Sequence, residues 1–238
     1  METTTRAILL NEREARVLSL VGARLTEWDS GMTARVIVAD SALAVYAVLP
    51  MDVMVALAVP AQVDEDAIGD DVTTSLATFV RGVSDAVAAN QSVRFDTASL
   101  PQLTAPVGHG LTLASLPPAD GWQMPIHGVS SDITPQIREA IEEFRERTRG
   151  MPEYQAAPVA EEIWSRAAWA GLPMRVLHAA RRLRLMTDEP LRVTAATCGP
   201  WKRLSTPRGQ VFSYTAGIEA RLGLRVVAPP GKGVPFGL

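Results

Sequence analysis

Apolar positions in the first ninety residues follow two different periods. Residues 11–27 carry apolar side chains three and four positions apart, which predicts a helix, and 72–90 repeat that spacing. Between them, residues 33–40, 42–49 and 53–59 form three apolar or β-branched runs divided by short polar or proline-containing breaks. Runs this close together leave room only for tight turns, so the pattern predicts an antiparallel meander flanked by two helices.

Two of the predicted strands, 42–49 and 53–59, are apolar on both faces. Such strands need cover on both sides, because a bare apolar sheet face promotes aggregation. We expect the helices at 11–27 and 72–90 to cover one face. The other face then needs a helix at 132–148 or a second copy of the chain.

The second half of the chain reads as three helices followed by strands. Thr134-Pro135 opens a helix over 132–148, and Gly150-Met151-Pro152 ends it. The remaining elements are predicted as helices at 158–170 and 173–186 and strands at 191–197, 201–206 and 210–215. The pattern predicts an α+β fold in which antiparallel sheet meanders pack with about five helices.

The Gly-Met-Pro break also predicts the domain organisation. Residues 1–150 would form an α+β subdomain that contains the antiparallel meander. Residues 151–238 would form a helical hairpin, a small strand meander and a loose C-terminal tail. No internal repeat is visible in the sequence.

Composition narrows the class of protein. The chain has 238 residues, 47% of them hydrophobic and 21% charged, with a net charge of −3, so it can bury a core. The single cysteine, Cys198, excludes an intramolecular disulfide and fits a reducing compartment. Charges interrupt the N-terminal stretch, and no apolar run is long enough to cross a bilayer. We therefore expect a cytoplasmic protein that does not bind membranes.

The small net charge hides an asymmetry. Residues 1–170 hold 12 basic and 23 acidic side chains, a net of −11, whereas residues 171–238 hold 11 and 3, a net of +8. An acidic partner for the basic end is one explanation. The other is that the basic end packs against the acidic body of its own chain or of a second copy.

The segment 158–210 carries the clearest functional pattern, because it partly fits a helix-turn-helix followed by a basic wing. Candidate contacts to nucleic acid or to another partner are the basic side chains of the second helix and of the strands after it: Arg175, His178, Arg182, Lys202, Arg203 and Arg208. Arg166 opposes this interpretation, since it occupies a position that is normally apolar. A helical hairpin with a solvated arginine face would give the same string.

Other motifs do not indicate a catalytic or metal site. TCGPWK, residues 197–202, resembles a thioredoxin motif, but Trp201 replaces the second cysteine, and flanking strand patterns predict a hairpin turn. The acidic segment 64–71 lacks the oxygen ligands of a calcium loop. No metal, no cofactor and no catalytic residue is assigned. An enzyme built from His109 or His127 with distant carboxylates stays an open alternative.

Three segments carry a family resemblance: SLPPADGWQMPIHGVSSD, GLPMRVLHAARRLRLM and TCGPWKRLSTPRGQVF. They resemble blocks in an uncharacterised family of actinobacterial proteins of unknown function. The resemblance covers mainly the second half of the chain and implies no activity, ligand or functional residue.

These observations favour a non-enzymatic protein that works through protein–protein interaction, either with another protein or with itself as a homo-oligomer, most simply a homodimer. The first alternative is a DNA-binding regulator that uses the helix-turn-helix-like unit at 158–210. The second alternative is the enzyme with an unidentified site.

Overall fold

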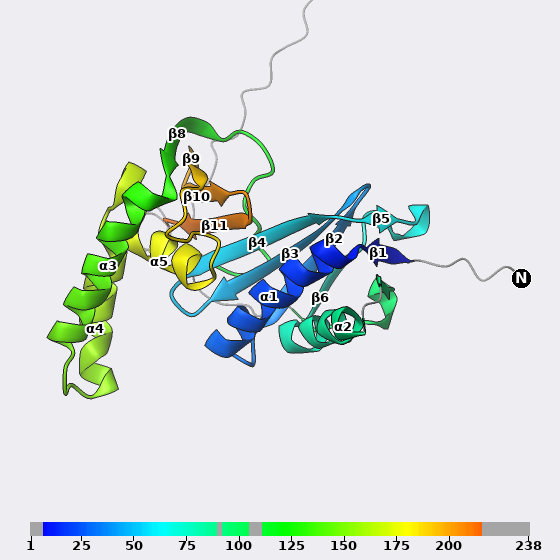
Figure 1. Ribbon diagram of the computed structural model, residues 1–238, viewed down its shortest axis with the longest axis horizontal. Helices are drawn as coiled ribbons and strands as arrows, with labels where there is room; N and C mark the ends of the chain where they lie inside the picture. The colour runs from blue at the N-terminus through cyan, green and yellow to red at the C-terminus, as the bar shows by residue number, and fades with distance from the viewer. Residues whose placement is uncertain (1–6, 90–91, 105–110, 216–238) are drawn as a thin grey trace, which may run out of the picture.

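The fold is seen in a computed structural model, which describes residues 7–89, 92–104 and 111–215 (Figure 1). The helices of this part are α1 (Glu12–Trp28), α2 (Leu76–Ala88), α3 (Ser130–Arg147), α4 (Glu153–Ser165) and α5 (Met174–Arg182). The strands are β1 (Ile8–Leu10), β2 (Thr33–Ala39), β3 (Ala42–Leu49), β4 (Val53–Pro60), β5 (Gln62–Val63), β6 (Asp71–Ser75), β7 (Val93–Phe95), β8 (Gln123–Val129), β9 (Arg192–Cys198), β10 (Trp201–Thr206) and β11 (Gly209–Tyr214).

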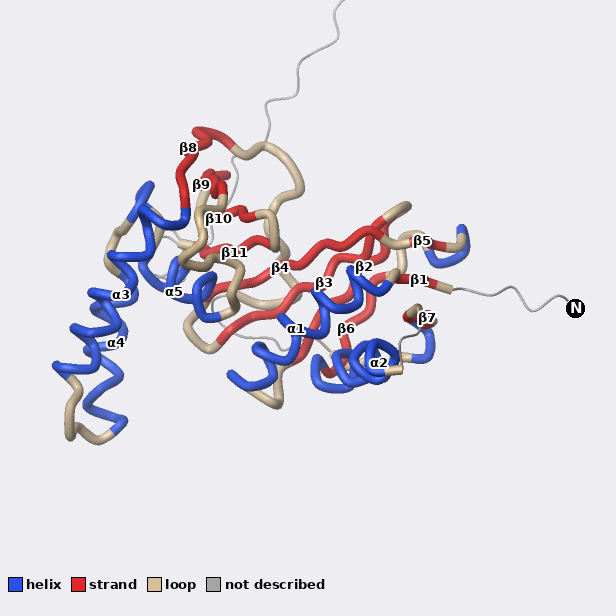
Figure 2. Tube along the Cα trace, viewed as in Figure 1, coloured by secondary structure: helices blue, strands red, loops and turns tan. Residues whose placement is uncertain are grey.

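One eight-stranded sheet organises the molecule (Figure 2). Its strand order is β6-β2-β3-β4-β11-β10-β9-β8, and every neighbouring pair is antiparallel. A second, three-stranded sheet has the order β5-β1-β7. The predicted α+β class with antiparallel meanders and five helices is confirmed.

The large sheet consists of two similar halves. In each half a helix leads into three consecutive antiparallel strands: α1 precedes β2-β3-β4, and α5 precedes β9-β10-β11. The halves meet where β11 pairs with β4, through residues 210–212 and 54–56. The sequence shows no repeat, but the topology repeats. Strands from both sides of residue 150 join in this sheet, and the division of the chain at that residue stays a prediction.

Helices cover one face of the sheet. Along β4, the alternate residues Val53, Val55, Leu57 and Val59 are buried in the main core, to which α1, α2 and α5 also contribute. The period-2 pattern of the strands and the helical spacing of α1 and α2 thus point at the same layer. The expected covering of one face by these two helices is confirmed.

The opposite face has a different cover from the one expected. Met54 and Phe212 lie on this face in a smaller aromatic-rich cluster, and Leu111 and Trp122 from the connection between the halves pack on it. Helix α3 does not cover this face, because it packs along α4 and α5 beyond the end of the meander (Figure 1). Of the two covers expected for this face, the helix at 132–148 is therefore not the one found, and the second copy of the chain stays a prediction.

The start of the second helix is a further correction. Residues 71–75 form the edge strand β6, and α2 begins only at Leu76, where the Ser75 hydroxyl accepts a hydrogen bond from the Thr78 N–H. The strand runs into the helix without a break, so helical spacing alone extended the helix too far. Among the helices in the described ranges, none is long and apolar enough to span a membrane.

Candidate functional site

The structure does not present α5 as a recognition helix. Residues 166–173 separate α4 from α5, whereas a helix-turn-helix uses a turn of three or four residues. Five of the nine residues of α5 are buried in the main core: Met174, Val176, Leu177, Ala179 and Ala180. The separation of the two helices therefore does not fit the helix-turn-helix motif, and a DNA contact by 158–210 stays a prediction.

Arg175, His178 and Arg182 do share one face of α5, but this face contacts the protein's own side chains. The Arg175 guanidinium donates to Glu161 Oε1 at 2.6 Å and is only 13% exposed. Arg182 places its guanidinium carbon 4.4 Å from the centroid of the Trp28 ring. A cation over an aromatic face is attracted to it, so this arginine is held against α1.

His178 lies between two tryptophans. Its ring stacks on Trp164 with the centroids 4.4 Å apart and meets the edge of Trp28 at 6.2 Å. Burial, and secondarily the charge of Arg182, lowers the pKa of His178 to about 4. Its Nδ1 is buried and has no hydrogen-bond partner among the described residues. The imidazole is therefore neutral at pH 7 and acts as a packing group.

The three basic candidates after α5 are dispersed. Lys202 and Arg203 are neighbours on β10, so their side chains lie on opposite faces of the sheet: Lys202 Nζ donates to the Gly171 carbonyl at 2.6 Å, and the Arg203 guanidinium carbon lies 4.2 Å from the Trp122 ring centroid. Arg208 lies in the β10–β11 turn, 3.6 Å from Glu189 Oε2. The six candidates do not form one surface.

Carboxylates of the same chain pair with two arginines of the helical hairpin. Arg147 and Arg166 each bind both Glu143 and Glu162 in a network that joins α3, α4 and the residue after α4. Hydrogen bonds from Arg147 and then Arg166 lower the pKa of Glu162 to about 2. Arg166, which opposed the helix-turn-helix pattern, therefore holds the helical hairpin together.

Cys198 lies in the predicted hairpin. It ends β9 and pairs in register with Trp201, the first residue of β10, across the turn made by Gly199 and Pro200. Gly199 has a φ of +54°, which glycine adopts without strain. The Cys198 Sγ lies 3.8 Å from the Asp120 carbonyl oxygen. The segment 197–202, which resembles a thioredoxin motif, is therefore a hairpin turn.

The alternative of an enzyme gains no arrangement of catalytic groups from the described residues. His127 Nδ1 lies 3.1 Å from the Thr194 hydroxyl across the β8–β9 pair, and His109 lies outside the described residues. In the described parts of the chain, no three side chains of His, Cys, Asp or Glu are placed to hold a metal ion. Carboxylates of the acidic segment instead bind other parts of the same chain. Asp64 Oδ2 accepts a hydrogen bond from the Ala7 N–H at 2.9 Å, and Asp71 Oδ2 forms an ion pair with Arg35 at 2.6 Å.

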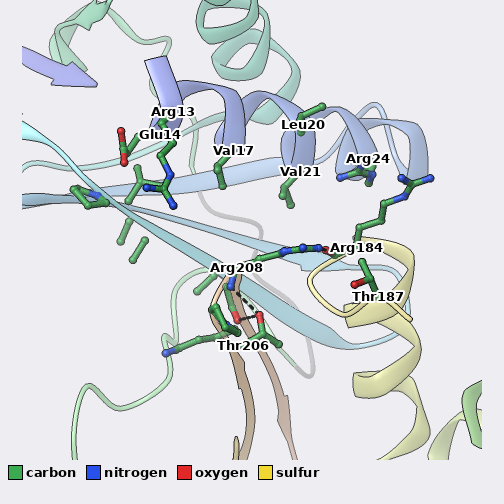
Figure 3. A pocket seen from close by; sticks show the side chains of 18 of the residues that line it. Arg13, Glu14, Val17, Leu20, Val21, Arg24, Arg184, Thr187, Thr206 and Arg208 are labelled. Carbon is green, nitrogen blue, oxygen red and sulfur yellow. Dashed lines mark hydrogen bonds between the residues drawn. The ribbon is translucent and has the colours of Figure 1, made fainter. Parts of the chain in front are cut away.

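A groove lies between the two halves (Figure 3). Its volume is about 1100 Å³, and its walls come from α1, from the loop 184–189 after α5 and from the β10–β11 turn. Four arginines line it: Arg13, Arg24, Arg184 and Arg208. Only Arg208 belongs to the predicted set. Arg13 and Arg24 look like ordinary solvated positions of an amphipathic helix, so only the fold reveals this cluster.

Comparison with known proteins finds one match to a domain family of unknown function, and it finds solved structures with a similar fold. Residues 117–218 match a family model described as a domain of unknown function, DUF8185. That match includes most of the segments that carry the actinobacterial resemblance, which itself stays a prediction. A search of curated proteins finds no sequence relative of this chain.

Solved structures with similar folds are bacterial sliding clamps. A protein of Eubacterium rectale described as a DNA polymerase III beta subunit aligns with a TM-score of 0.57 and 8% identity, over 91% of this chain and 67% of its own. Two structures from Caulobacter crescentus, pol III beta and the DNA polymerase sliding clamp, give TM-scores of 0.53 and 0.52 at 13% identity. They cover 90% and 94% of this chain and 67% and 70% of their own. At such identities the likeness shows the fold alone.

Proposed function

We propose that this protein acts without catalysis, by binding protein surfaces, and that its first partner is a second copy of itself at strand β8. The observation that carries the proposal is the exposure of β8. This strand is the last of the eight-stranded sheet, and its described neighbour, β9, lies on one side only. Along it, Met124 and Ile126 are 76% and 43% exposed.

An edge strand with exposed apolar side chains favours pairing with another strand, because its outward N–H and C=O groups lack strand partners. The first part of β8 is poorly suited to this, since Pro125 has no N–H and the register shifts between Gln123 and Ile126. The following residues, Ile126–Val129, pair regularly with β9. Their outer edge is the surface we assign to the second copy.

Two further observations support a binding protein. The fold neighbours are described as a subunit of DNA polymerase III, a protein that belongs to an assembly. The described residues also include an aromatic-rich cluster on the helix-free face, where Trp122 and Tyr214 stay partly exposed around Phe212. We further propose a cytoplasmic location, which the single free cysteine, Cys198, supports.

Light scattering over a range of concentrations tests self-association. We expect a dimer that dissociates on dilution and that the double variant Met124→Lys/Ile126→Lys makes monomeric, because lysines on an edge disfavour strand pairing. Met151→Lys is the matched control, since Met151 is also exposed, at 44%, but lies between α3 and α4. Circular dichroism verifies that each variant is folded.

A wild-type protein that stays monomeric at every concentration would refute the proposal. So would a dimer that the Met151→Lys variant weakens as much as the double variant does.

A further inference from the structure

Three arginines from distant parts of the chain converge at one end of the groove (Figure 3). Arg24 comes from α1, Arg184 from the loop after α5, and Arg208 from the β10–β11 turn. Burial lowers the pKa of Arg24, and the charges of Arg184 and Arg208 lower it further, against an opposing effect of Glu27. The guanidinium group of Arg24 is therefore close enough to those of Arg184 and Arg208 to be repelled by both.

The carboxylates nearby do not neutralise this cluster. In the described part of the chain, no carboxylate forms an ion pair with the guanidinium of Arg24 or of Arg184. Asp188 also lines the groove, but it is bound to Arg181 at 2.9 Å and to Arg138 at 3.6 Å. Glu189 reaches only Arg208, at 3.6 Å.

Some arginines elsewhere in the molecule are closely paired. Arg35, Arg147 and Arg175 each have a carboxylate oxygen at 2.6 Å. Arg24 and Arg184 lack such a partner and line the same groove, so their guanidinium groups offer a place for an anion from outside the chain.

The backbone at Arg184 strengthens this interpretation. Arg184 has a φ of +57°, in the left-handed region where glycine is comfortable and an arginine is strained. It follows α5 at the position where helices commonly end in glycine. Its carbonyl oxygen accepts a hydrogen bond from Arg208 Nη1 at 3.2 Å, which joins two members of the cluster. A guanidinium is thus held at a position where a glycine would be more stable.

The remaining lining of the groove indicates which other chemical groups a ligand would have. Thr187 lines the groove, and its hydroxyl oxygen is buried without a hydrogen-bond partner among the described residues. Val17, Leu20 and Val21 form an apolar wall on α1, and Leu20 is 58% exposed. The volume of about 1100 Å³ is slightly above the range of roughly 300–1,000 Å³ that is typical of small-molecule sites.

We propose that the groove binds a small molecule that carries a diphosphate on an uncharged body, as a nucleoside diphosphate does. Arg24, Arg184 and Arg208 hold the phosphate oxygens, since planar guanidinium groups donate two parallel hydrogen bonds to such an anion. The hydroxyl of Thr187 donates to the same group, and the wall of α1 covers the body. Glu14 and Glu189 also line the groove and disfavour a continuous nucleic-acid backbone there.

Isothermal titration calorimetry at about 0.15 M salt tests this with three probes: inorganic diphosphate, ADP and a short DNA duplex. We expect ADP to bind more tightly than inorganic diphosphate, because only ADP reaches the apolar wall. Arg24→Gln and Arg184→Gly should each weaken ADP binding about tenfold or more, the loss expected for a charge-assisted hydrogen bond. Arg16→Gln is the control on the same helix, since Arg16 pairs with Glu12 and does not line the groove.

The variant Arg184→Gly separates lost binding from lost folding. Because it relieves the left-handed strain, its thermal midpoint without ligand should equal or exceed that of the wild type. Four results would each overturn the proposal: no binding of ADP, equal binding of ADP and inorganic diphosphate, equal losses in Arg16→Gln and Arg24→Gln, or duplex binding that depends on the same arginines and exceeds that of ADP.

Discussion

The contact between α1 and α2 gives a quantitative test of the packing that supports the groove. Gly22 lies in the middle of α1, and a Cβ added there would stand 2.3 Å from Val80 Cγ2 and 3.2 Å from Val80 Cγ1 on α2. Real Cβ atoms do not approach so closely, and Val80 is only 8% exposed. Gly82, in the middle of α2, has nothing within 4 Å of its added Cβ. The two glycines therefore differ in packing and not in helical position.

The magnitudes follow from this difference. Replacing a glycine by alanine inside a helix gains about 1 kcal/mol of intrinsic helix stability at either position. At Gly22 the new methyl group also overpacks the interface, which costs about 1–3 kcal/mol. We expect Gly82→Ala to stabilise the protein by about 1 kcal/mol and Gly22→Ala to be neutral or to destabilise it by up to about 2 kcal/mol. For a chain of this size each kcal/mol shifts the midpoint by about 2–4 °C.

Thermal and urea unfolding followed by circular dichroism measure both variants. A third variant, Gly22→Ala/Val80→Ala, identifies the cause, because removing the valine methyl groups makes room for the new Cβ. The double variant should lose less stability than the sum of the two single changes, with a coupling of about 1 kcal/mol. Equal stabilisation by Gly22→Ala and Gly82→Ala would refute the close approach of the two helices.

Two further predictions concern single residues. The pKa of His178 in the folded protein is about 4, below the usual 6.5, so the unfolded chain binds the extra proton first as the pH falls. The free energy of unfolding should therefore decrease by about 3 kcal/mol between pH 6.5 and pH 4. His178→Phe should reduce this pH dependence, which urea unfolding at several pH values measures. An unchanged pH profile of the variant would argue against a buried neutral imidazole. Cys198→Ser should change the free energy of unfolding by less than about 0.5 kcal/mol, because the thiol lies in a turn; a large loss in thermal unfolding would contradict an inert turn position.

The sequence predicted the elements that carry a strong period. Strands β2, β3 and β4 were found within a residue of their ends, since each is long, apolar and bounded by turn residues. The strands β1, β5 and β7 have two or three residues each, too few to show an alternation. They depend on pairing partners that lie far away in the chain.

The basic face of α5 shows why helical spacing alone does not predict a binding surface. Arg175, His178 and Arg182 recur on one face, as the sequence indicated, and a period cannot tell whether that face meets solvent or protein. The decision comes from Trp28 on α1 and Trp164 on α4, whose rings receive Arg182 and His178. For the same reason the groove arginines were missed, because Arg24 and Arg184 are 160 positions apart in the sequence and meet only through the fold.

The two ends of the large sheet are not equivalent, and this limits what can be built from the protein. At β6, the Leu103 N–H already donates to the Thr73 carbonyl at 2.8 Å, so a segment of the same chain occupies part of that edge. β8 has no such cover among the described residues. A subunit with two open edges could add neighbours without end and grow into a filament. With one open edge, the two copies of the proposed dimer would meet through the same surface, the pair would be related by twofold symmetry, and growth would stop at two.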